Sequence, residues 1–400
     1  MTTPTFLKSA ALAALAALIA APAAAQDLKI GALMPMTGDL QAYGEANVKG
    51  VRLAEKLINE AGGVNGGKVA VSVADTQTNP QAGVDAAQKL VNVENVNAIV
   101  GPMASGVTIP VTTSVTAREG VLTISPSATS PTITTLDDNG FLFRTAPSDA
   151  FQGVALASLV AKKGTQKVAI VFVNNDYGQG LADAFEASFS GTVTAKLPFE
   201  PGQASYRGEL QRAASGEPEA LLLIAYPENG IVLIRQALEG GYFDKFIFTD
   251  GMKSPDVIAQ IGADYLNTAY GTSTIAVESK QLEDFKAAYN AEYGELPPLP
   301  YIDSGFDATM LIALAAAKAG SNDRSAIRDA LLEVASPPGE VVGPGDFAKA
   351  LELIAAGTDI NYDGAAGSQD FDANGDVPGI IGEWTMENGQ INDVGEVELD

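Results

Sequence analysis

Two hydroxyl side chains stand where the sequence changes from a buried strand to a helix. Ser105 follows the apolar segment Ala98–Val100, and Thr129 follows Val121–Ile124, each after a short loop. The first turn of a helix leaves backbone N–H groups unpaired and carries a partial positive charge, so it binds anions without a cationic side chain. Ser105 and Thr129 therefore either hold an anionic group of a ligand or act as ordinary helix caps.

An aspartate and an aromatic residue follow strands in the second half of the chain. Asp250 directly follows the segment Phe246–Thr249, and Tyr226 precedes Pro227 after another strand. In α/β sheets, ligands bind beyond the carboxyl ends of the strands. Asp250 is thus either the partner of a ligand cation or a solvated turn residue before Gly251. Tyr226 either lines a cleft or packs in a hydrophobic core, and the core is the more common place for a single tyrosine.

An acidic turn near the C-terminus has the spacing of oxygen ligands. Asp370, Asp372, Asn374 and Asp376 occupy alternating positions with a glycine at the bend, as in calcium loops. Ile381 stands where such a loop needs its bidentate glutamate. We therefore expect no metal and a tight acidic turn, with a calcium loop as the alternative.

The composition removes most catalytic chemistry. The 400 residues contain no histidine and no cysteine, which excludes Ser-His-Asp triads, thiol chemistry and Cys/His zinc sites. Gly178-Gln179-Gly180 lacks the third glycine of a dinucleotide fingerprint, and no phosphate-binding P-loop is present. We expect neither an enzyme nor a cofactor. The formal net charge of −25 opposes nucleic-acid binding and favours solubility.

Strands and helices alternate through two successive units, which predicts two parallel sheets covered by helices on both faces. The expected strands are 28–34, 69–74, 98–100 and 121–124 in the first unit, and 168–173, 193–197, 220–225 and 246–249 in the second. The expected helices are 42–61, 79–93, 105–118, 151–161, 181–189, 205–214 and 229–240.

The last third of the chain is different. It reads as helices 280–293, 303–319, 324–333 and 345–355 without strands, followed by a hairpin around Asn388-Gly389. Helices alone cannot form a third sheet domain, so they must pack back on a sheet already made, most readily the first. The chain then passes between two lobes more than once, with a cleft between them.

The N-terminal segment Met1–Ala25 has one charge, Lys8, then an apolar run and a small-residue end, Ala23-Ala24-Ala25. This pattern predicts a signal peptide cleaved after Ala25. Without cysteine the mature N-terminus cannot carry a lipid, and no other segment is apolar and long enough to cross a bilayer. We expect a periplasmic protein that is not a lipoprotein.

The sequence resembles the type I periplasmic solute-binding proteins of ABC transporters, in the leucine/isoleucine/valine-binding branch. The resemblance spans nearly the whole mature chain, and the order and spacing of its motifs make it specific. The motifs are Ile30–Gly44 (IGALMPMTGDLQAYG) with Gly50, Asn59–Gly67 (NEAGGVNGG), Asp75–Ala82 (DTQTNPQA), Val100–Ser105 (VGPMAS), Gly120–Pro131 (GVLTISPSATSP), Phe143-Arg144-Thr145, Asn175–Gly180 (NDYGQG), Ile234–Ala237 with Gly240, and Gly305–Ala308 (GFDA).

The resemblance implies two α/β lobes joined by three hinge strands, with crossings near residues 146, 276 and 378. The N-terminal lobe would comprise 26–146 and 276–377, and the C-terminal lobe 147–275 and 378–400. It implies that Ser105, Ala128 and Thr129 hold a ligand carboxylate, that the Ser127 carbonyl accepts from the ligand ammonium, and that Asp250 pairs with it. It implies aromatic walls at Tyr43, Tyr177, Tyr226 and Phe306.

Two positions depart from the family pattern. Asp250 stands where glutamate is usual, and Phe306 replaces a more usual tyrosine. The resemblance implies a monomeric, non-enzymatic component of an importer that captures a small amino acid, branched-chain or aliphatic, and docks on a membrane permease. Two alternatives stay open: a different ligand, such as a short amide, urea or an aromatic acid, and a receptor role towards a membrane sensor.

Overall fold

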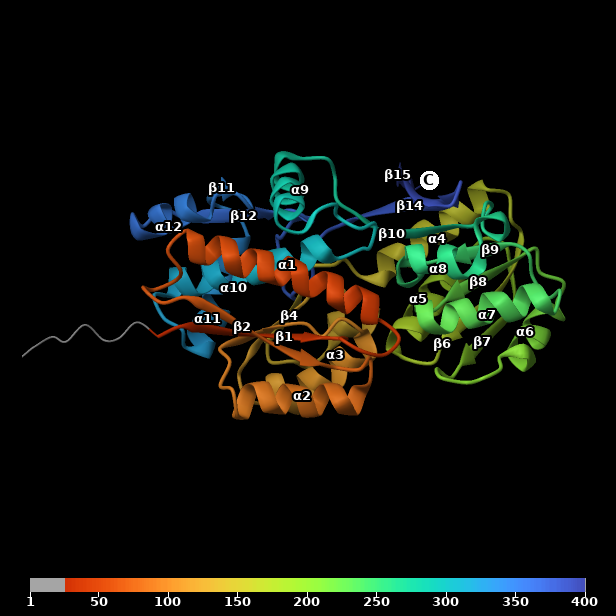
Figure 1. Ribbon diagram of the computed structural model, residues 1–400, viewed down its shortest axis with the longest axis horizontal. Helices are drawn as coiled ribbons and strands as arrows, with labels where there is room; N and C mark the ends of the chain where they lie inside the picture. The colour runs from red at the N-terminus through yellow and green to blue at the C-terminus, as the bar shows by residue number, and fades with distance from the viewer. Residues whose placement is uncertain (1–25, 400) are drawn as a thin grey trace, which may run out of the picture.

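The computed structural model describes residues 26–399 as two α/β lobes side by side (Figure 1). The predicted signal peptide lies outside these described residues. The N-terminal lobe contains a five-stranded parallel sheet in the order β2-β1-β3-β4-β5. Its strands are β1 (Leu28–Met34), β2 (Val69–Asp75), β3 (Ala98–Val100), β4 (Leu122–Ser125) and β5 (Leu142–Arg144).

Helices cover both faces of this sheet (Figure 1). α2 (Pro80–Asn92) and α3 (Ser105–Val111) pack together on one face, while α1 (Gln41–Glu60) packs with helices from the last third of the chain on the other. Those later helices are α9 (Lys280–Tyr293), α10 (Ile302–Ala319), α11 (Arg324–Ala335) and α12 (Phe347–Ala355). α10 is buried on almost every side, which explains its nearly continuous apolar sequence. The expectation that these helices return to the first sheet is thus confirmed.

The C-terminal lobe is built on a seven-stranded sheet in the order β15-β14-β10-β9-β8-β6-β7. Its strands are β6 (Lys167–Val173), β7 (Thr192–Phe199), β8 (Ala220–Ile224), β9 (Phe246–Phe248), β10 (Tyr270–Ile275), β14 (Ile380–Glu387) and β15 (Gln390–Glu396). Its helices are α4 (Asp149–Lys162), α5 (Asp176–Ser188), α6 (Arg207–Ala214), α7 (Pro227–Glu239) and α8 (Pro255–Ile261). β6 to β10 run parallel, whereas the predicted hairpin β14–β15 joins antiparallel at the β10 edge.

Three expectations are wrong in detail. The last third does contain strands before the hairpin: β11 (Glu340–Val342), β12 (Ile360–Gly364) and β13 (Gly367–Ser368) form a small sheet. These strands are two to five residues long, so the alternation of buried and half-buried residues in β12 is too short to distinguish it from a loop among the acidic and glycine residues around it. The helix expected over 105–118 changes to π-helical spacing at Thr112–Thr116, just after Pro110, which removes a backbone donor. The expected elements also omit β5, β10 and the helix Pro255–Ile261; in β10, Gly271, Thr272 and Ser273 weaken the apolar pattern.

The chain passes between the two sheets three times. It leaves the first sheet after β5, leaves the second after β10, and enters the second again at β14. Each lobe is therefore made from segments far apart in sequence, and the lobes can rotate about these crossings with little change inside either core.

Candidate functional site

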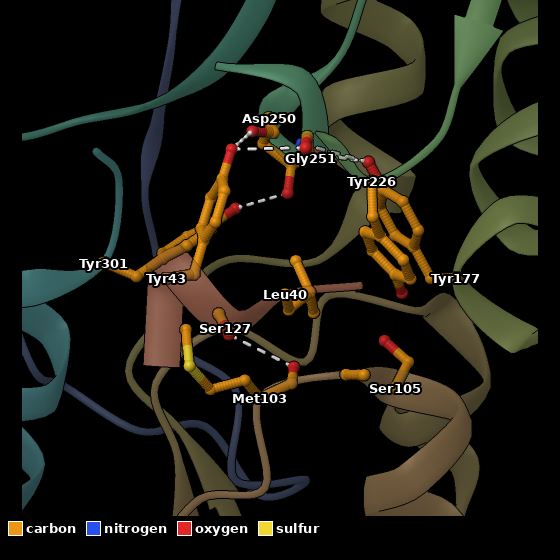
Figure 2. Close-up of a pocket in the computed structure, with 11 residues that line it drawn as sticks. Leu40, Tyr43, Met103, Ser105, Ser127, Tyr177, Tyr226, Asp250, Gly251 and Tyr301 are labelled. Carbon is orange, nitrogen blue, oxygen red and sulfur yellow. Dashed lines mark hydrogen bonds between the residues drawn. The ribbon is translucent and has the colours of Figure 1, made fainter. Parts of the chain in front are cut away.

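A pocket lies between the lobes, beyond the carboxyl ends of strands from both sheets (Figure 2). The N-terminal lobe contributes the start of α1, the loop before α3 and the loop after β4, while the C-terminal lobe contributes α5 and the ends of β8 and β9. The lining residues are Leu40, Tyr43, Met103, Ala104, Ser105, Ser127, Tyr177, Tyr226, Asp250, Gly251 and Tyr301.

Asp250 is a buried carboxylate at the end of β9. Its Oδ1 accepts hydrogen bonds from the Tyr177 hydroxyl at 2.8 Å and from Gln152 Nε2 at 3.1 Å. Its Oδ2 accepts from the Tyr301 hydroxyl at 2.9 Å. Burial raises the pKa of Asp250, and these hydrogen bonds oppose that rise without cancelling it. All three side-chain donors are neutral, so a cation placed in this pocket would meet a carboxylate not yet paired with a positive charge.

A second buried carboxylate, Asp149, lies close to the first. Its Oδ2 accepts from Thr129 Oγ1 at 2.8 Å, whereas Oδ1 has no hydrogen-bond partner within the described chain. Burial and the charge of Asp250 raise the pKa of Asp149 well above its usual range, and the Thr129 bond and the Arg144 charge oppose this. Sequence reasoning missed Asp149 because an acidic residue in the first turn of a helix, here α4, is ordinary.

The hydroxyl groups on the opposite wall belong to the N-terminal lobe. Ser105 begins α3, and its Oγ accepts the backbone N–H of Ser130 at 3.1 Å, which leaves its own proton available for donation. Ser127 Oγ donates to the Met103 carbonyl at 3.1 Å. Thr129 and Ala128, which were expected beside them, do not line the pocket. The Thr129 hydroxyl is turned to Asp149, and the Ala128 N–H donates to Ser125 Oγ at 3.0 Å.

A fully buried arginine holds the loop that carries these residues. Arg144 Nη1 donates to the carbonyls of Ala128 and Ser130 at 3.2 and 2.9 Å. Its Nε and Nη2 bind the two carboxylate oxygens of Asp376 at 2.6 and 2.8 Å, and Nη2 also donates to Thr134 at 2.8 Å. All five guanidinium protons are thereby used, so this pair fixes both the loop and the acidic turn.

The same contacts account for the acidic turn at 370–376. Asp376 is committed to Arg144, and Asp372 Oδ1 accepts the backbone N–H groups of Asn374 and Asp376 at 2.8 and 3.0 Å. Across residues 26–399, no group of three or more acidic side chains is arranged to hold a metal ion. The turn is held by the Asp372 side chain and by the Arg144–Asp376 pair, and these contacts give the calcium-loop alternative no support.

Aromatic rings form the rest of the wall. Tyr177 and Tyr226 stack with centroids 5.4 Å apart and an interplanar angle of 13°. Tyr43 belongs to the other lobe, and its hydroxyl donates to the backbone carbonyls of Asp250 and Gly251 at 3.3 and 3.2 Å (Figure 2). This bridge links the two lobes directly across the pocket.

The structure places Phe306 away from the pocket, so its assignment to the wall is wrong. Phe306 is fully buried in α10 and packs on Phe285 with centroids 5.1 Å apart. Tyr301, five residues earlier, lines the pocket instead. The sequence pattern did not predict Tyr301 in the pocket, because its position depends on a left-handed backbone conformation, φ 73°, just before α10.

The lobes are closed on each other in this arrangement. Beside the Tyr43 bridge, a Cβ added to Gly180 in α5 would lie 2.8 Å from Pro131 Cδ of the other lobe. The space left in the pocket is about 20 Å³, room for about one water molecule. A ligand of several heavy atoms therefore has to enter while the lobes are apart.

The fold and the interlobe pocket define a two-lobed binding protein, and comparison with known sequences agrees. A family model described as periplasmic binding protein matches residues 27–360. The chain belongs to this family, with the type I fold, and is a substrate-binding protein rather than an enzyme. Among the helices of residues 26–399, none combines the length and apolar character needed to span a bilayer.

Individual relatives share most of the chain. The Leu/Ile/Val-binding protein BraC3 of Rhizobium johnstonii is 34% identical over 332 residues, covering 81% of this chain and 89% of that protein. The chemotactic signal transduction system substrate-binding protein BasB of Halobacterium salinarum is 29% identical over 358 residues, covering 88% and 84%. The crystal structure of LivJ from Streptococcus pneumoniae with isoleucine has a TM-score of 0.78 at 27% identity, covering 94% of this chain and 100% of that chain.

Proposed function

We propose that this chain is the periplasmic substrate-binding component of an ABC importer, and that it captures a small amino acid, branched-chain or aliphatic, between its lobes. The observation that carries the proposal is Asp250, a buried carboxylate whose side-chain donors are all neutral. An amino acid brings an ammonium group for this carboxylate, and it brings a carboxylate for the Ser105 hydroxyl on the opposite wall.

The apolar parts of the wall suit an aliphatic side chain. Leu40, Met103 and the faces of Tyr43 and Tyr226 line the pocket, and they offer no further charge to a ligand side chain. The relatives named as Leu/Ile/Val-binding proteins support the same ligand class. Aspartate is one methylene shorter than glutamate, so we expect the ammonium to approach Asp250 closely or through a water molecule.

Capture and delivery follow from the lobe arrangement. The ligand binds first to one lobe, and closure then adds contacts from the other, so ligand shifts the population towards the closed form. We assign the hinge to the crossings near residues 146, 276 and 378, between a lobe of 26–146 with 276–377 and a lobe of 147–275 with 378–400. The closed monomer would dock on a membrane permease, without a cofactor and after cleavage of the 1–25 signal peptide.

A thermal-shift screen tests the ligand class. The mature protein is unfolded and refolded to remove carried-over ligand, then mixed with amino acids, urea, short amides and aromatic acids. A ligand at 100 times its dissociation constant adds about 2.7 kcal/mol of stability, which moves the midpoint by several degrees. We expect leucine, isoleucine or valine to do so. A rise in the melting midpoint only with amides or simple acids would mean that Asp250 does not pair with an ammonium group.

A second function, presenting the closed form to a membrane sensor, is favoured by one relative. BasB of Halobacterium salinarum is named as part of a chemotactic signal transduction system. The two roles use the same ligand-induced closure. They differ in the protein that binds the closed form, which a pull-down of the liganded chain with solubilised permease or sensor would distinguish.

A further inference from the structure

A second and larger cavity lies where the three crossings between the lobes come together. Its volume is about 690 Å³, compared with about 20 Å³ for the closed ligand pocket. Both lobes and all three crossings contribute to its wall, which includes Thr145, Pro147, 274–278, 296–304, 377–380 and 393–396. None of the crossing residues lines the ligand pocket. We therefore treat this rear cavity as a separate space.

Part of the wall of the rear cavity is apolar. Leu282 and Phe285 of α9 line it together with Leu299 of the loop before α10. Two further apolar residues on the wall, Val277 and Val394, are 56% and 60% exposed. An apolar group placed in the cavity would remove these side chains from water, which is favourable.

Both lysines of the rear cavity are paired with carboxylates that also line it. Lys253 is buried and binds Asp393 at 2.6 Å, and Lys286 binds Glu278 at 3.2 Å. Their charges are thus balanced inside the cavity, so neither ammonium group needs an anionic ligand.

Asp303, at the start of α10, has no such partner. Its Oδ1 accepts the backbone N–H of Ser304 at 2.9 Å, and no lysine or arginine of residues 26–399 forms an ion pair with it. Burial raises the pKa of Asp303, and the more distant charges of Lys253 and Lys286 oppose that rise without cancelling it. Glu396 is a second unpaired carboxylate on the wall. The rear cavity therefore has a surplus of negative charge beside its apolar wall.

We propose that the rear cavity is a second binding site, for an organic ammonium ion with an apolar body. The ammonium group pairs with Asp303, and the body covers Leu282, Phe285 and Leu299. Because both lysines are already paired, the site offers nothing to a carboxylate and prefers simple amines to amino acids. This second site goes beyond the proposed function, since it does not depend on which ligand the pocket between the lobes takes.

Occupation of the rear cavity favours the closed form. When two lobes rotate about a hinge, surfaces on one side of the hinge approach each other while those on the other side separate. In this structure the ligand pocket is closed and the rear cavity is wide. An occupant of the rear cavity thus opposes opening of the lobes, and by linkage each ligand raises the affinity for the other.

Calorimetric titration with phenethylamine tests the site, because this amine has an aromatic body and no carboxylate for Ser105. Phenethyl alcohol, its neutral counterpart, controls for the charge. We expect saturable binding of the amine, and binding of the alcohol that is weaker by roughly tenfold. Asp303→Asn should lose roughly tenfold in amine affinity, whereas the exposed control Asp244→Asn should lose none. Leu299→Trp, which fills part of the cavity, should give a similar loss and replaces Asp303→Asn if that variant does not fold.

Leucine titrated in the presence of saturating phenethylamine should bind several-fold more tightly than leucine alone, and Asp303→Asn should abolish this difference. Three results would overturn the inference and leave the proposed function intact: competition between the amine and leucine, equal affinity for the amine and the alcohol, or full amine affinity in both Asp303→Asn and Leu299→Trp. Equal leucine affinity with and without the amine would overturn the coupling to closure. Amine binding without any amino-acid binding would overturn the proposed function and support the second site.

Discussion

At the residue scale, the pocket depends on how a buried negative charge is balanced. Asp250 is 4% exposed and is stabilised by Tyr177, Tyr301 and Gln152. Hydrogen bonds from neutral groups reduce the cost of burying a carboxylate but do not replace a counter-charge. Asp149 adds a second buried carboxyl nearby, with one oxygen unpaired among the described residues. A ligand ammonium would stabilise both.

Removing the charge of Asp250 should separate binding from folding. Asp250→Asn keeps the shape but leaves a ligand ammonium without its partner, so we expect amino-acid affinity to fall by roughly 2–5 kcal/mol, as for one member of a buried charge pair. The melting temperature without ligand should not fall much, since a costly buried charge is removed. Calorimetric titration measures the first effect and thermal unfolding the second.

The matched control is Asp244→Asn, a substitution at an exposed aspartate outside the pocket. It should change neither quantity. Full affinity in Asp250→Asn would show that the ammonium group is held elsewhere.

The predicted site residues that line the pocket lie at or near the ends of regular elements. Tyr226 and Asp250 follow buried strands of the second sheet, and Ser105 begins the helix that follows β3 of the first sheet. Strand polarity therefore places each residue at the carboxyl end of its own sheet. Tyr301 and Phe306 show the limit. Which of two aromatic residues five positions apart faces the pocket depends on one backbone angle, and the sequence pattern does not encode that angle.

At the scale of elements, the closed form depends on close approach of α5 to the opposite lobe. A Cβ on Gly180 would lie 2.8 Å from Pro131 Cδ and 3.2 Å from Ser130 Oγ, which both belong to the N-terminal lobe. Neither atom belongs to the fold of the lobe that carries Gly180. The glycine is therefore needed for closure and not for the stability of its own helix, where alanine is the better residue.

Gly180→Ala should weaken ligand binding without unfolding the protein. We expect a several-fold loss of affinity because closure now requires Pro131 and Ser130 to shift. Gly208→Ala is the matched control: it also changes a helical glycine of this lobe, and a Cβ there meets no atom within 4 Å. Titration calorimetry measures the ligand affinity of the two variants. Equal affinities would mean that ligand binding does not require this closed contact.

Helix α10 carries a carboxyl group that links stability to pH. Asp307 is buried, and its oxygens accept from the Tyr362 hydroxyl at 2.7 Å and from the backbone N–H groups of Ala365 and Ala366 at 2.9 and 2.8 Å. Burial raises the pKa of Asp307 from its ordinary 3.8 to about 7, against these hydrogen bonds. The folded protein thus binds this proton more tightly than the unfolded chain does.

The sign of the effect follows from linkage. The contribution of Asp307 to the free energy of unfolding is complete below about pH 4 and is lost as the pH rises to about 7. Between pH 4.5 and 7.5, we expect the free energy of unfolding to fall less in Asp307→Asn than in the parent or in the control Asp244→Asn. Urea unfolding at the two pH values measures this fall. If the free energy of unfolding falls with pH as steeply in Asp307→Asn as in the parent, the titrating group lies elsewhere. Asp149 and Asp303 are examples, because burial also raises their pKa values.

At the scale of the whole molecule, the two parallel sheets and the return of the last helices could be predicted, because buried strands alternate with helices at regular spacing. The small sheet β11–β13 could not, because its strands are two to five residues long and the alternation in β12 is too short to distinguish it from a loop. The closed lobe arrangement also lies beyond sequence reasoning, since it depends on contacts such as Tyr43 with Asp250 that join residues 207 positions apart.

The central claim is that an amino acid binds between the lobes and holds them closed. Calorimetric titration of the refolded, ligand-free mature protein with leucine tests it most directly. We predict saturable binding of one leucine per chain, with a negative heat-capacity change from burial of apolar surface. The absence of heat with leucine and every other amino acid, together with saturable binding of an amide or an aromatic acid, would contradict the account.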